Sequence, residues 1–154
     1  MSDAPELVVA ALRAAGVDAD VRRFDEPVPT AVAAAEALGC EVGAIANSRV
    51  FDADGKPLLV LASGAHRVDT AKVAALVGVH RVRRATPEFV FAATGQEVGG
   101  VAPVGHPAPL RPVVDVDLAA HRVIWAGGGD HHTMFAASYE DLLRATGGEP
   151  AAVA

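Results

Sequence analysis

The sequence predicts a mixed α/β fold, in which helices surround a partly antiparallel sheet. Segments with apolar residues at helical spacing alternate with short Val- and Leu-rich segments, which is typical of α/β proteins. Two of the short segments flank the dipeptide Asp54-Gly55, a turn typical of antiparallel hairpins. The 154 residues are 51% hydrophobic, yet they include only five Phe, one Tyr and one Trp. This composition suits helices packed closely on a Val-rich sheet with a sizeable core.

The first elements are a helix, a strand and a second helix. Residues 5–15 place apolar side chains at helical spacing and begin with a proline suited to the first turn. Residues 20–24 are expected to form a short strand that the following prolines end. The second helix, over residues 31–38, follows the capping residue Thr30 and ends at Gly39. Its almost all-alanine face allows close approach to a neighbour.

The hairpin has two arms, residues 45–52 and 57–62. The second arm is apolar on both faces and is expected inside the sheet. The first arm alternates, so Asn47, Arg49 and Phe51 are expected on one face of the strand. This polar pair either marks a site or lies on a solvated face.

A third helix is expected over residues 70–77, capped by Asp69. Residues 79–84 are expected to form a strand, and their arginines either form a solvated edge or bind a nucleic acid. The segment Thr86-Pro87-Glu88 is typical of a helix start, and Gly95 would end that fourth helix.

The last third of the chain begins extended, over residues 109–115, before a single turn capped by Asp117. A buried strand over residues 122–126 follows, then a helix over residues 139–145 that begins with a capping-box pattern. We predict one domain over residues 1–148 and a disordered tail over residues 149–154.

A glycine-rich stretch, residues 99–107, organises the centre of this chain. Its glycines and prolines cannot continue a helix or a central strand. Glycines let a ligand approach the backbone, and successive N–H groups can converge on a carbonyl, carboxylate or phosphate oxygen. The alternative is an ordinary loop between two elements.

Other polar groups give weaker signals. Of the adjacent His131 and His132, only one could share a site with a distant ligand if they lie on a strand, so a metal site is not favoured. Cys40 has no basic partner nearby in sequence and is expected to be inert. Ser48 and Ser63 are not in a nucleophile elbow. No protein nucleophile is therefore predicted.

Charge and composition restrict the partners. A net charge of −6 argues against a broad grip on a nucleic-acid backbone, DNA included, but not against a local site for one nucleic-acid end. No apolar run approaches the roughly 20 residues that span a bilayer, so no membrane partner is expected. The acidic start lacks a signal-peptide pattern and there is one cysteine, which together predict a cytoplasmic protein.

Four stretches, in order, resemble one known family. They are residues 29–39, the strand Ile45-Ala46-Asn47-Ser48-Arg49-Val50-Phe51, the segment from Arg67-Val68-Asp69 through Lys72 to Arg81-Val82-Arg83, and the loop Gly99-Gly100-Val101-Ala102-Pro103. The YbaK/EbsC family, the editing domain associated with prolyl-tRNA synthetase, has similar stretches. Its strand reads Ile-Ala-Lys-Thr-Leu-Val-Phe and its loop Gly-Gly-Val-Ser-Pro. The resemblance covers about residues 5–146, with the GxxxP signature at Gly99 to Pro103.

The resemblance implies hydrolysis of mischarged aminoacyl-tRNA at the CCA end, without a cofactor. Ester hydrolysis places negative charge on the carbonyl oxygen, which backbone N–H groups of the loop could stabilise. The nucleophile would be water or, for a thiol substrate, the substrate itself. The expected catalytic residues are Gly99, Gly100, Val101, Ala102, Pro103 and Asn47. The expected substrate-binding residues are Thr30, Ser48, Arg49, Gly64, His106, Asp130 and His131, and no metal ligand is expected.

Asn47 departs from the family pattern. The resemblance implies a lysine at this position, and in the family that lysine contacts the terminal nucleotide and the ester region. A neutral amide loses a charge-assisted hydrogen bond worth about 1.5–3 kcal/mol. Arg49 stands on the same face where the family usually has an apolar residue. It either restores the charge or is a solvated arginine.

The leading functional hypothesis is a freestanding aminoacyl-tRNA deacylase, a monomer or weak homodimer whose partners are the tRNA 3′ end and, as a second candidate, a tRNA synthetase. The alternative is a weak or inactive homologue that binds a CCA end, a synthetase or a small amino-acid-like ligand. A metal hydrolase built on His131 or His132 is a third hypothesis.

Overall fold

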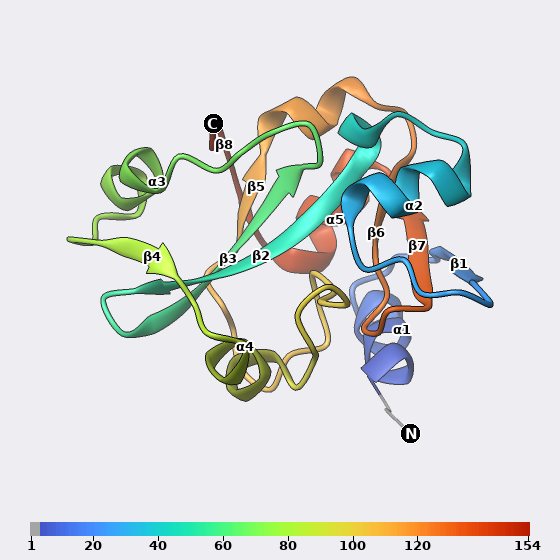
Figure 1. Ribbon diagram of the computed structural model, residues 1–154, viewed down its shortest axis with the longest axis horizontal. Coiled ribbons are helices and arrows are strands. Elements are labelled where there is room, and N and C mark those ends of the chain that lie inside the picture. The colour runs from blue at the N-terminus through green and yellow to red at the C-terminus, as the bar shows by residue number, and fades with distance from the viewer. Residues whose placement is uncertain (1–3) are drawn as a thin grey trace.

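A long hairpin lies at the centre of the sheet in the computed structural model, which describes residues 4–154 (Figure 1). Its arms are β2 (Ile45–Ala53) and β3 (Lys56–Ser63). At the turn, Asp54 and Gly55 have φ values of 52° and 89°, and the Gly55 N–H donates to Asp52 Oδ1 at 2.7 Å. The Asp-Gly turn therefore sets the register of the two arms, as its sequence predicts.

Six further strands extend the hairpin into one eight-stranded mixed sheet of order β1-β7-β6-β2-β3-β5-β8, with β4 also paired to β2. Their bounds are β1 (Asp20–Arg23), β4 (Val82–Arg84), β5 (Val113–Asp115), β6 (Ile124–Gly127), β7 (Thr133–Ala137) and β8 (Glu149–Ala151). The pairs β2–β6, β3–β5 and β5–β8 are parallel, and the others are antiparallel. The predicted mixed α/β fold is confirmed.

Within residues 4–154, five α-helices cover this sheet: α1 (Ala4–Ala14), α2 (Ala31–Leu38), α3 (Thr70–Val77), α4 (Pro87–Thr94) and α5 (Tyr139–Thr146). Helices α1, α4 and α5 share one buried hydrophobic cluster with Leu59 and Leu61 of β3 and lie on that face. Helices α2 and α3 pack on the other face, near opposite ends of β2 (Figure 1). The middle of β2 is thus free of a helix on that face, which leaves room for a cavity.

The helix ends follow the predicted capping pattern. The four predicted caps, Thr30, Asp69, Thr86 and Ser138, each accept a hydrogen bond from a backbone N–H three residues on. Each of these helices ends at a glycine with positive φ. Local hydrogen bonding therefore sets the limits of α2 to α5.

The end of the chain differs from the expectation. Residues 149–154, expected to form a disordered tail, include β8, which pairs with β5. Val153 is fully buried, and its carbonyl accepts a hydrogen bond from the Asp69 N–H at 2.8 Å. The tail is ordered because it completes the edge of the sheet and fills the core under α3.

Several element limits also differ. The strand expected over residues 79–84 begins only at Val82, since the Val79 N–H still bonds to the end of α3. The extended segment expected over residues 109–115 forms a strand only from Val113. The strand expected over residues 122–126 is Ile124–Gly127. Asp115, rather than Asp117, caps the short helix η2 (Val116–Ala120), because its carboxylate accepts from the Asp117 N–H.

None of the helices within residues 4–154 has the length and apolar character needed to cross a membrane. Residues 1–3 lie outside the described residues; they belong to the acidic start on which the expectation of no signal peptide rests, and they open the expected domain.

Candidate functional site

A gap in the sheet lies along one edge of β2. One edge of this strand pairs with β3 over Ala46 to Ala53. The other edge pairs with β6 only at Ile45 and Ala46, and with β4 only from Phe51 onward. Between these two neighbours, residues 47–50 have no strand beside them, and a cavity of about 360 Å³ opens there.

Backbone groups of β2 point into this gap. Pro57 has no N–H, so its pairing with Asp52 is of the non-hydrogen-bonded type. Hydrogen-bonded and non-hydrogen-bonded residue pairs alternate along two antiparallel strands. Val50 and Ser48 therefore also make no backbone hydrogen bond to β3. Their N–H and C=O groups are therefore directed at the gap.

The glycine-rich loop forms the opposite wall, through Val98, Gly99 and Val101. The Gly100 N–H donates to Glu97 O at 3.0 Å, and the Ala102 N–H donates to Gln96 Oε1 at 2.7 Å. No acceptor within residues 4–154 receives a hydrogen bond from the N–H of Gly99 or Val101. The two expected catalytic residues of this loop that line the cavity are thus the two with unused N–H groups.

The other residues of the signature lie behind the wall. Ala102 is fully buried, Pro103 is buried, and neither lines the cavity. A Cβ built on Gly100 would come within 2.7 Å of the Asp130 carbonyl carbon, which shows how closely the loop packs on that turn. These three residues position Gly99 and Val101.

Side chains around the loop hold it in place. Gln96 is 2% exposed, and its Nε2 donates to Val104 O at 3.4 Å while its Oε1 accepts from Ala102. His106 Nε2 donates to Ala102 O at 2.8 Å. His131 Nε2 donates to Val98 O at 2.9 Å. Three side chains from outside the signature thus fix the shape of its backbone.

Helix α2 supplies a third wall through Thr30, Ala31 and Ala34. The Thr30 side chain is engaged as the helix cap, since its Oγ1 accepts from the Ala33 N–H at 3.1 Å. The alanine side chains allow the helix to lie close to β2 and still leave space for the cavity.

The polar groups of the cavity come from distant parts of the chain. Asn47, Ser48 and Arg49 line it from β2, and Asp130 lines it from the turn before β7. The buried hydroxyls of Ser48 and Thr133 have no hydrogen-bond partner among the described residues. A buried hydroxyl without a partner is costly, and both residues line the cavity.

Arg49 is half-buried beside the cavity. Its guanidinium lies 5.4 Å from the centre of the Phe51 ring. Burial, followed by the charge of Arg84, lowers the pKa of Arg49 from its usual value. Asn47 and Arg49 lie on the same face of β2, as the strand alternation predicts, and both line the cavity.

Three of the expected substrate-binding residues lie away from the cavity. Gly64 packs under η1 (Val42–Ala44), where an added Cβ would come within 2.4 Å of Val42 O. His106 lines a separate cavity next to α1, and burial lowers the pKa of its imidazole. His131 contacts the loop from outside the cavity lining.

The histidine pair and the single cysteine show no catalytic arrangement in the described residues. His131 bonds to Val98 O, whereas His132 Nδ1 bonds to Phe24 O at 3.1 Å. Burial is the main cause that raises the pKa of the Cys40 thiol, which favours its uncharged form.

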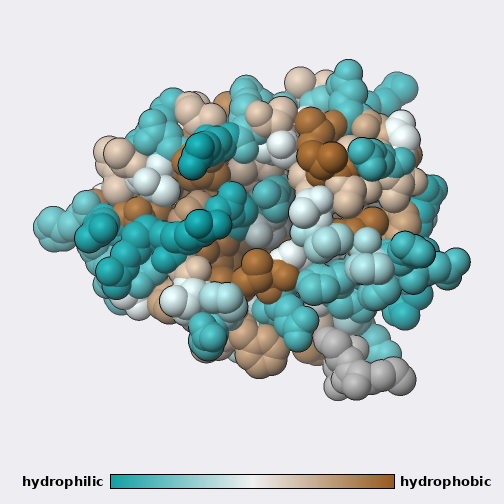
Figure 2. All heavy atoms as spheres, viewed as in Figure 1, coloured by the Kyte–Doolittle hydropathy of each residue, from teal (hydrophilic) through white to brown (hydrophobic). Residues whose placement is uncertain are grey.

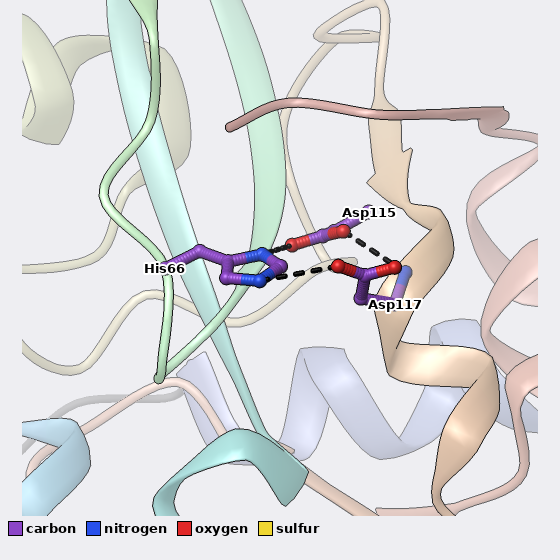
Figure 3. A group of neighbouring side chains, drawn as sticks. All are labelled: His66, Asp115 and Asp117. Carbon is purple, nitrogen blue, oxygen red and sulfur yellow. Dashed lines mark hydrogen bonds and ion pairs between the residues drawn. The ribbon is translucent and has the colours of Figure 1, made fainter.

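One other cluster of titratable side chains lies outside the cavity (Figure 3). His66 Nδ1 is 2.7 Å from Asp115 Oδ2, and His66 Nε2 is 3.1 Å from Asp117 Oδ2. Both ring nitrogens therefore face carboxylates, and Asp115 Oδ2 also accepts from the Ser63 N–H. The arrangement ties the loop after β3 to the start of η2, and it leaves neither nitrogen of the ring directed at an open position.

The family follows from comparison with known proteins. Residues 25–145 match the model of the family described as the aminoacyl-tRNA editing domain. The chain belongs to this editing-domain family. The family identified by resemblance in the sequence is confirmed, and its GxxxP loop is the wall that carries the unused N–H groups.

Relatives of this editing domain include synthetases. The chain is 28% identical over 124 residues to the uncharacterized protein YwhH of Bacillus subtilis, covering 80% of this chain and 78% of YwhH. It is 32% identical over 123 residues to a proline–tRNA ligase of Nitratidesulfovibrio vulgaris, covering 73% of this chain. The editing domain spans about a fifth of the length of that ligase (21%).

Solved structures share the whole architecture. A protein described as a candidate trans-editing enzyme for prolyl-tRNA synthetase superposes with a TM-score of 0.91 at 39% identity, covering 99% of this chain and 98% of that one. The hypothetical protein APE2540 superposes with a TM-score of 0.89 at 29% identity, covering 96% and 98%.

Some cavity residues carried no recognisable sequence signal. Arg84 belongs to a basic run whose neighbouring side chains point in opposite directions, so the run alone does not show which arginine faces the cavity. Thr133 and Met134 lie in a strand that reads as core. Val98 is the exception, because its position directly before the glycine pair could have indicated it.

Proposed function

We propose that this protein is an aminoacyl-tRNA deacylase, which hydrolyses the ester that links an amino acid to the 3′ end of a mischarged tRNA. The observation that carries the proposal is the pair of unused N–H groups at Gly99 and Val101, on the cavity wall of a chain that belongs to the editing-domain family. Two such donors can stabilise the oxyanion formed during ester hydrolysis.

The proposed reaction needs no protein nucleophile. Water adds to the ester carbonyl carbon, and the carbonyl oxygen takes up negative charge opposite the N–H groups of Gly99 and Val101. The bond from this carbon to the ribose oxygen then breaks, and the ribose oxygen takes one proton of the attacking water, which leaves the free amino acid and the hydroxyl of the tRNA 3′ end. The hydroxyls of Ser48 and Thr133, which have no partner among the described residues, are the candidates to orient the substrate.

Asn47 and Arg49 divide the role of the single family lysine in this proposal. Asn47 supplies hydrogen-bond donors at the lysine position, and Arg49 supplies the positive charge from the same face of β2. The guanidinium of Arg49 is the positive charge, because the Arg49 side chain lines the cavity.

The test is a deacylation panel in which the purified protein meets tRNAs charged with Ala, Cys, Ser and Pro. Val101→Pro removes one of the two N–H donors, whereas the matched control Val101→Ala keeps it. We expect Val101→Pro to lower turnover about 100-fold or more, which is typical for loss of one oxyanion donor. Melting curves establish that both variants fold. Full turnover by a folded Val101→Pro protein would refute the role of this N–H.

A second candidate function is a non-catalytic module that binds the CCA end, a synthetase or a small amino-acid-like ligand. The neutral Asn47 favours it, because the family lysine is missing from the cavity. A parent protein that is inactive on all four charged tRNAs, and that Asn47→Lys makes active, would establish this alternative.

A further inference from the structure

Two arginines line the cavity, Arg49 from β2 and Arg84 from the neighbouring strand β4. Arg84 of β4 lies directly opposite Phe51 of β2, and directly opposed residues share a face of the sheet. Arg49 is two residues before Phe51 on that same face, which makes it the diagonal neighbour of Arg84. Both arginines line the cavity.

Neither arginine has an ionic partner. Among residues 4–154, no carboxylate forms an ion pair with Arg49 or Arg84. The one carboxylate that lines the cavity is Asp130, whose Oδ1 accepts from the His132 N–H at 2.9 Å. The two guanidinium groups therefore face the cavity without neutralisation, in a chain whose net charge is −6.

The proximity of the two cations is unfavourable without a ligand. Arg49 is half-buried, and both its burial and the charge of Arg84 lower its pKa. Like charges that lie near one another repel, and a counter-charge bound between them relieves this repulsion. Hydrophilic side chains run over β4 toward the middle of the face shown in Figure 2. Arg84 is exposed, so its guanidinium can be reached by a ligand from solution.

We propose that Arg49 and Arg84 together form a phosphate-binding site, which holds a phosphate group of the tRNA 3′ end. This assignment rests on the proposed function, in which the 3′-terminal nucleotide enters the cavity with its ester near Gly99 and Val101. Guanidinium groups suit a phosphate because their planar donors can bind two of its oxygens at once. The pair also explains how an acidic protein holds an RNA end through very few contacts.

Arg83 provides a matched control. It precedes Arg84 in the same short strand, but adjacent strand residues point to opposite faces. Its Nε lies 3.3 Å from Asp52 Oδ2, and it does not line the cavity. Arg83→Gln and Arg84→Gln therefore change the net charge equally at neighbouring positions, and only the second removes a cation from the cavity.

The experiment is a calorimetric titration of the whole protein at low salt with three probes: 5′-AMP, adenosine and inorganic phosphate. We expect the parent to bind 5′-AMP about tenfold or more tightly than adenosine, since only 5′-AMP carries a phosphate. Arg84→Gln and Arg49→Gln should reduce this ratio to about twofold, whereas Arg83→Gln should keep it. The slope of log affinity against log salt should fall by about one in Arg84→Gln but not in Arg83→Gln.

The outcomes separate this site from the proposed function. Equal affinity for 5′-AMP and adenosine, or an unchanged ratio of these two affinities in Arg84→Gln, overturns the phosphate-binding site. Inorganic phosphate that binds as tightly as 5′-AMP overturns the assignment to an RNA end in favour of free phosphate. If the protein deacylates a charged tRNA but does not prefer 5′-AMP to adenosine, the phosphate-binding site is refuted and the proposed function stands. A preference for 5′-AMP that depends on Arg84, in a protein inactive on every charged tRNA, supports the site and refutes the deacylase.

Discussion

Gly100 is a packing residue rather than a point of ligand approach. Its N–H is bonded to Glu97, and its Cα faces the backbone of Asp130. The neighbouring Gly99, with φ of 90°, is the glycine that lines the cavity. The two glycines of the signature therefore have different roles: Gly100 allows the loop to pack closely, and Gly99 leaves the loop surface at the cavity accessible.

Gly100→Ala should destabilise the protein through a steric clash. The added Cβ would come within 2.7 Å and 2.9 Å of two backbone atoms of Asp130, which cannot move aside like a flexible side chain. Gly39→Ala is the comparison, because its φ of 68° costs an alanine about 1–2 kcal/mol while nothing lies near its Cβ. Urea unfolding should show the larger loss for Gly100→Ala. A smaller loss than for Gly39→Ala would mean that the loop relaxes freely.

Arg49→Ala should lower deacylation about tenfold or more on a good substrate, since it removes a charge-assisted interaction worth about 1.5–3 kcal/mol. Asn47→Lys should partly restore the activity of this variant, because a lysine at position 47 starts from the same face of β2 and can reach the same region. Steady-state turnover on the best tRNA of the panel measures both effects. Unaltered turnover in both variants would show that Arg49 does not replace the family lysine.

The sequence indicates part of this site at the level of residues. Strand alternation places Asn47 and Arg49 on one face, and the glycine-rich loop identifies Gly99 and Val101. The contribution of Arg84 depends on its register opposite Phe51, which no local pattern encodes. His106 and Gly64 are polar or flexible residues near the motifs in sequence, but packing turns them away from the cavity.

The loop between α4 and β5 depends on a buried amide side chain. Gln96 accepts from Ala102 and donates to Val104, so it closes the loop from within. Its own N–H donates to Thr94 Oγ1 at 2.9 Å. The backbone of the signature loop therefore depends for its shape on Gln96, which lies three residues before Gly99.

Gln96→Leu should destabilise the protein by about 1–3 kcal/mol, because the Ala102 N–H and the Val104 C=O lose their buried partner. Leucine has a similar size, so the effect reports on hydrogen bonds rather than on volume. Chemical denaturation measures the loss. Turnover should fall further than stability predicts, since Gly99 and Val101 lose their fixed positions. A variant as stable and as active as the parent would show that water replaces the amide.

Helices could be predicted more fully than strands from this sequence. The caps and C-terminal glycines of α2 to α5 act locally, so their residues indicate the ends of each helix. Strands β4, β5 and β8 are three residues each, and pairing rather than propensity determines them. Strand β8 contains a proline and an exposed glutamate, so nothing in its composition predicts a place in the sheet.

At the scale of the whole molecule, the cavity is a product of topology. It exists because β4 and β6, which lie far apart in sequence, each pair with a different end of β2. Helices α2 and α3 cover opposite ends of the same strand and leave its middle accessible (Figure 1). These are long-range arrangements that no local pattern encodes, and the family resemblance implies only the mixed sheet with helices around it.

The stability of the molecule should decrease in mild acid because of His106. Burial lowers the pKa of this imidazole below its usual value of 6.5, so the folded state binds a proton less readily than the unfolded state. The associated stability is fully present above pH 6.5 and is lost as the pH falls toward the folded-state pKa. Protonation also places a charge next to the backbone that supports the signature loop, through the bond to Ala102 O.

His106→Gln tests this prediction, because glutamine has an amide N–H that can donate to Ala102 O but no group that titrates in this range. Other groups contribute to acid unfolding, so the informative quantity is the difference in unfolding free energy between parent and variant across pH 5–8, a range set by the usual histidine value. We expect the parent to lose more stability than the variant between pH 7 and pH 5. Parallel curves would mean that His106 is protonated equally well in the folded protein, and that burial of its ring does not disfavour the charge.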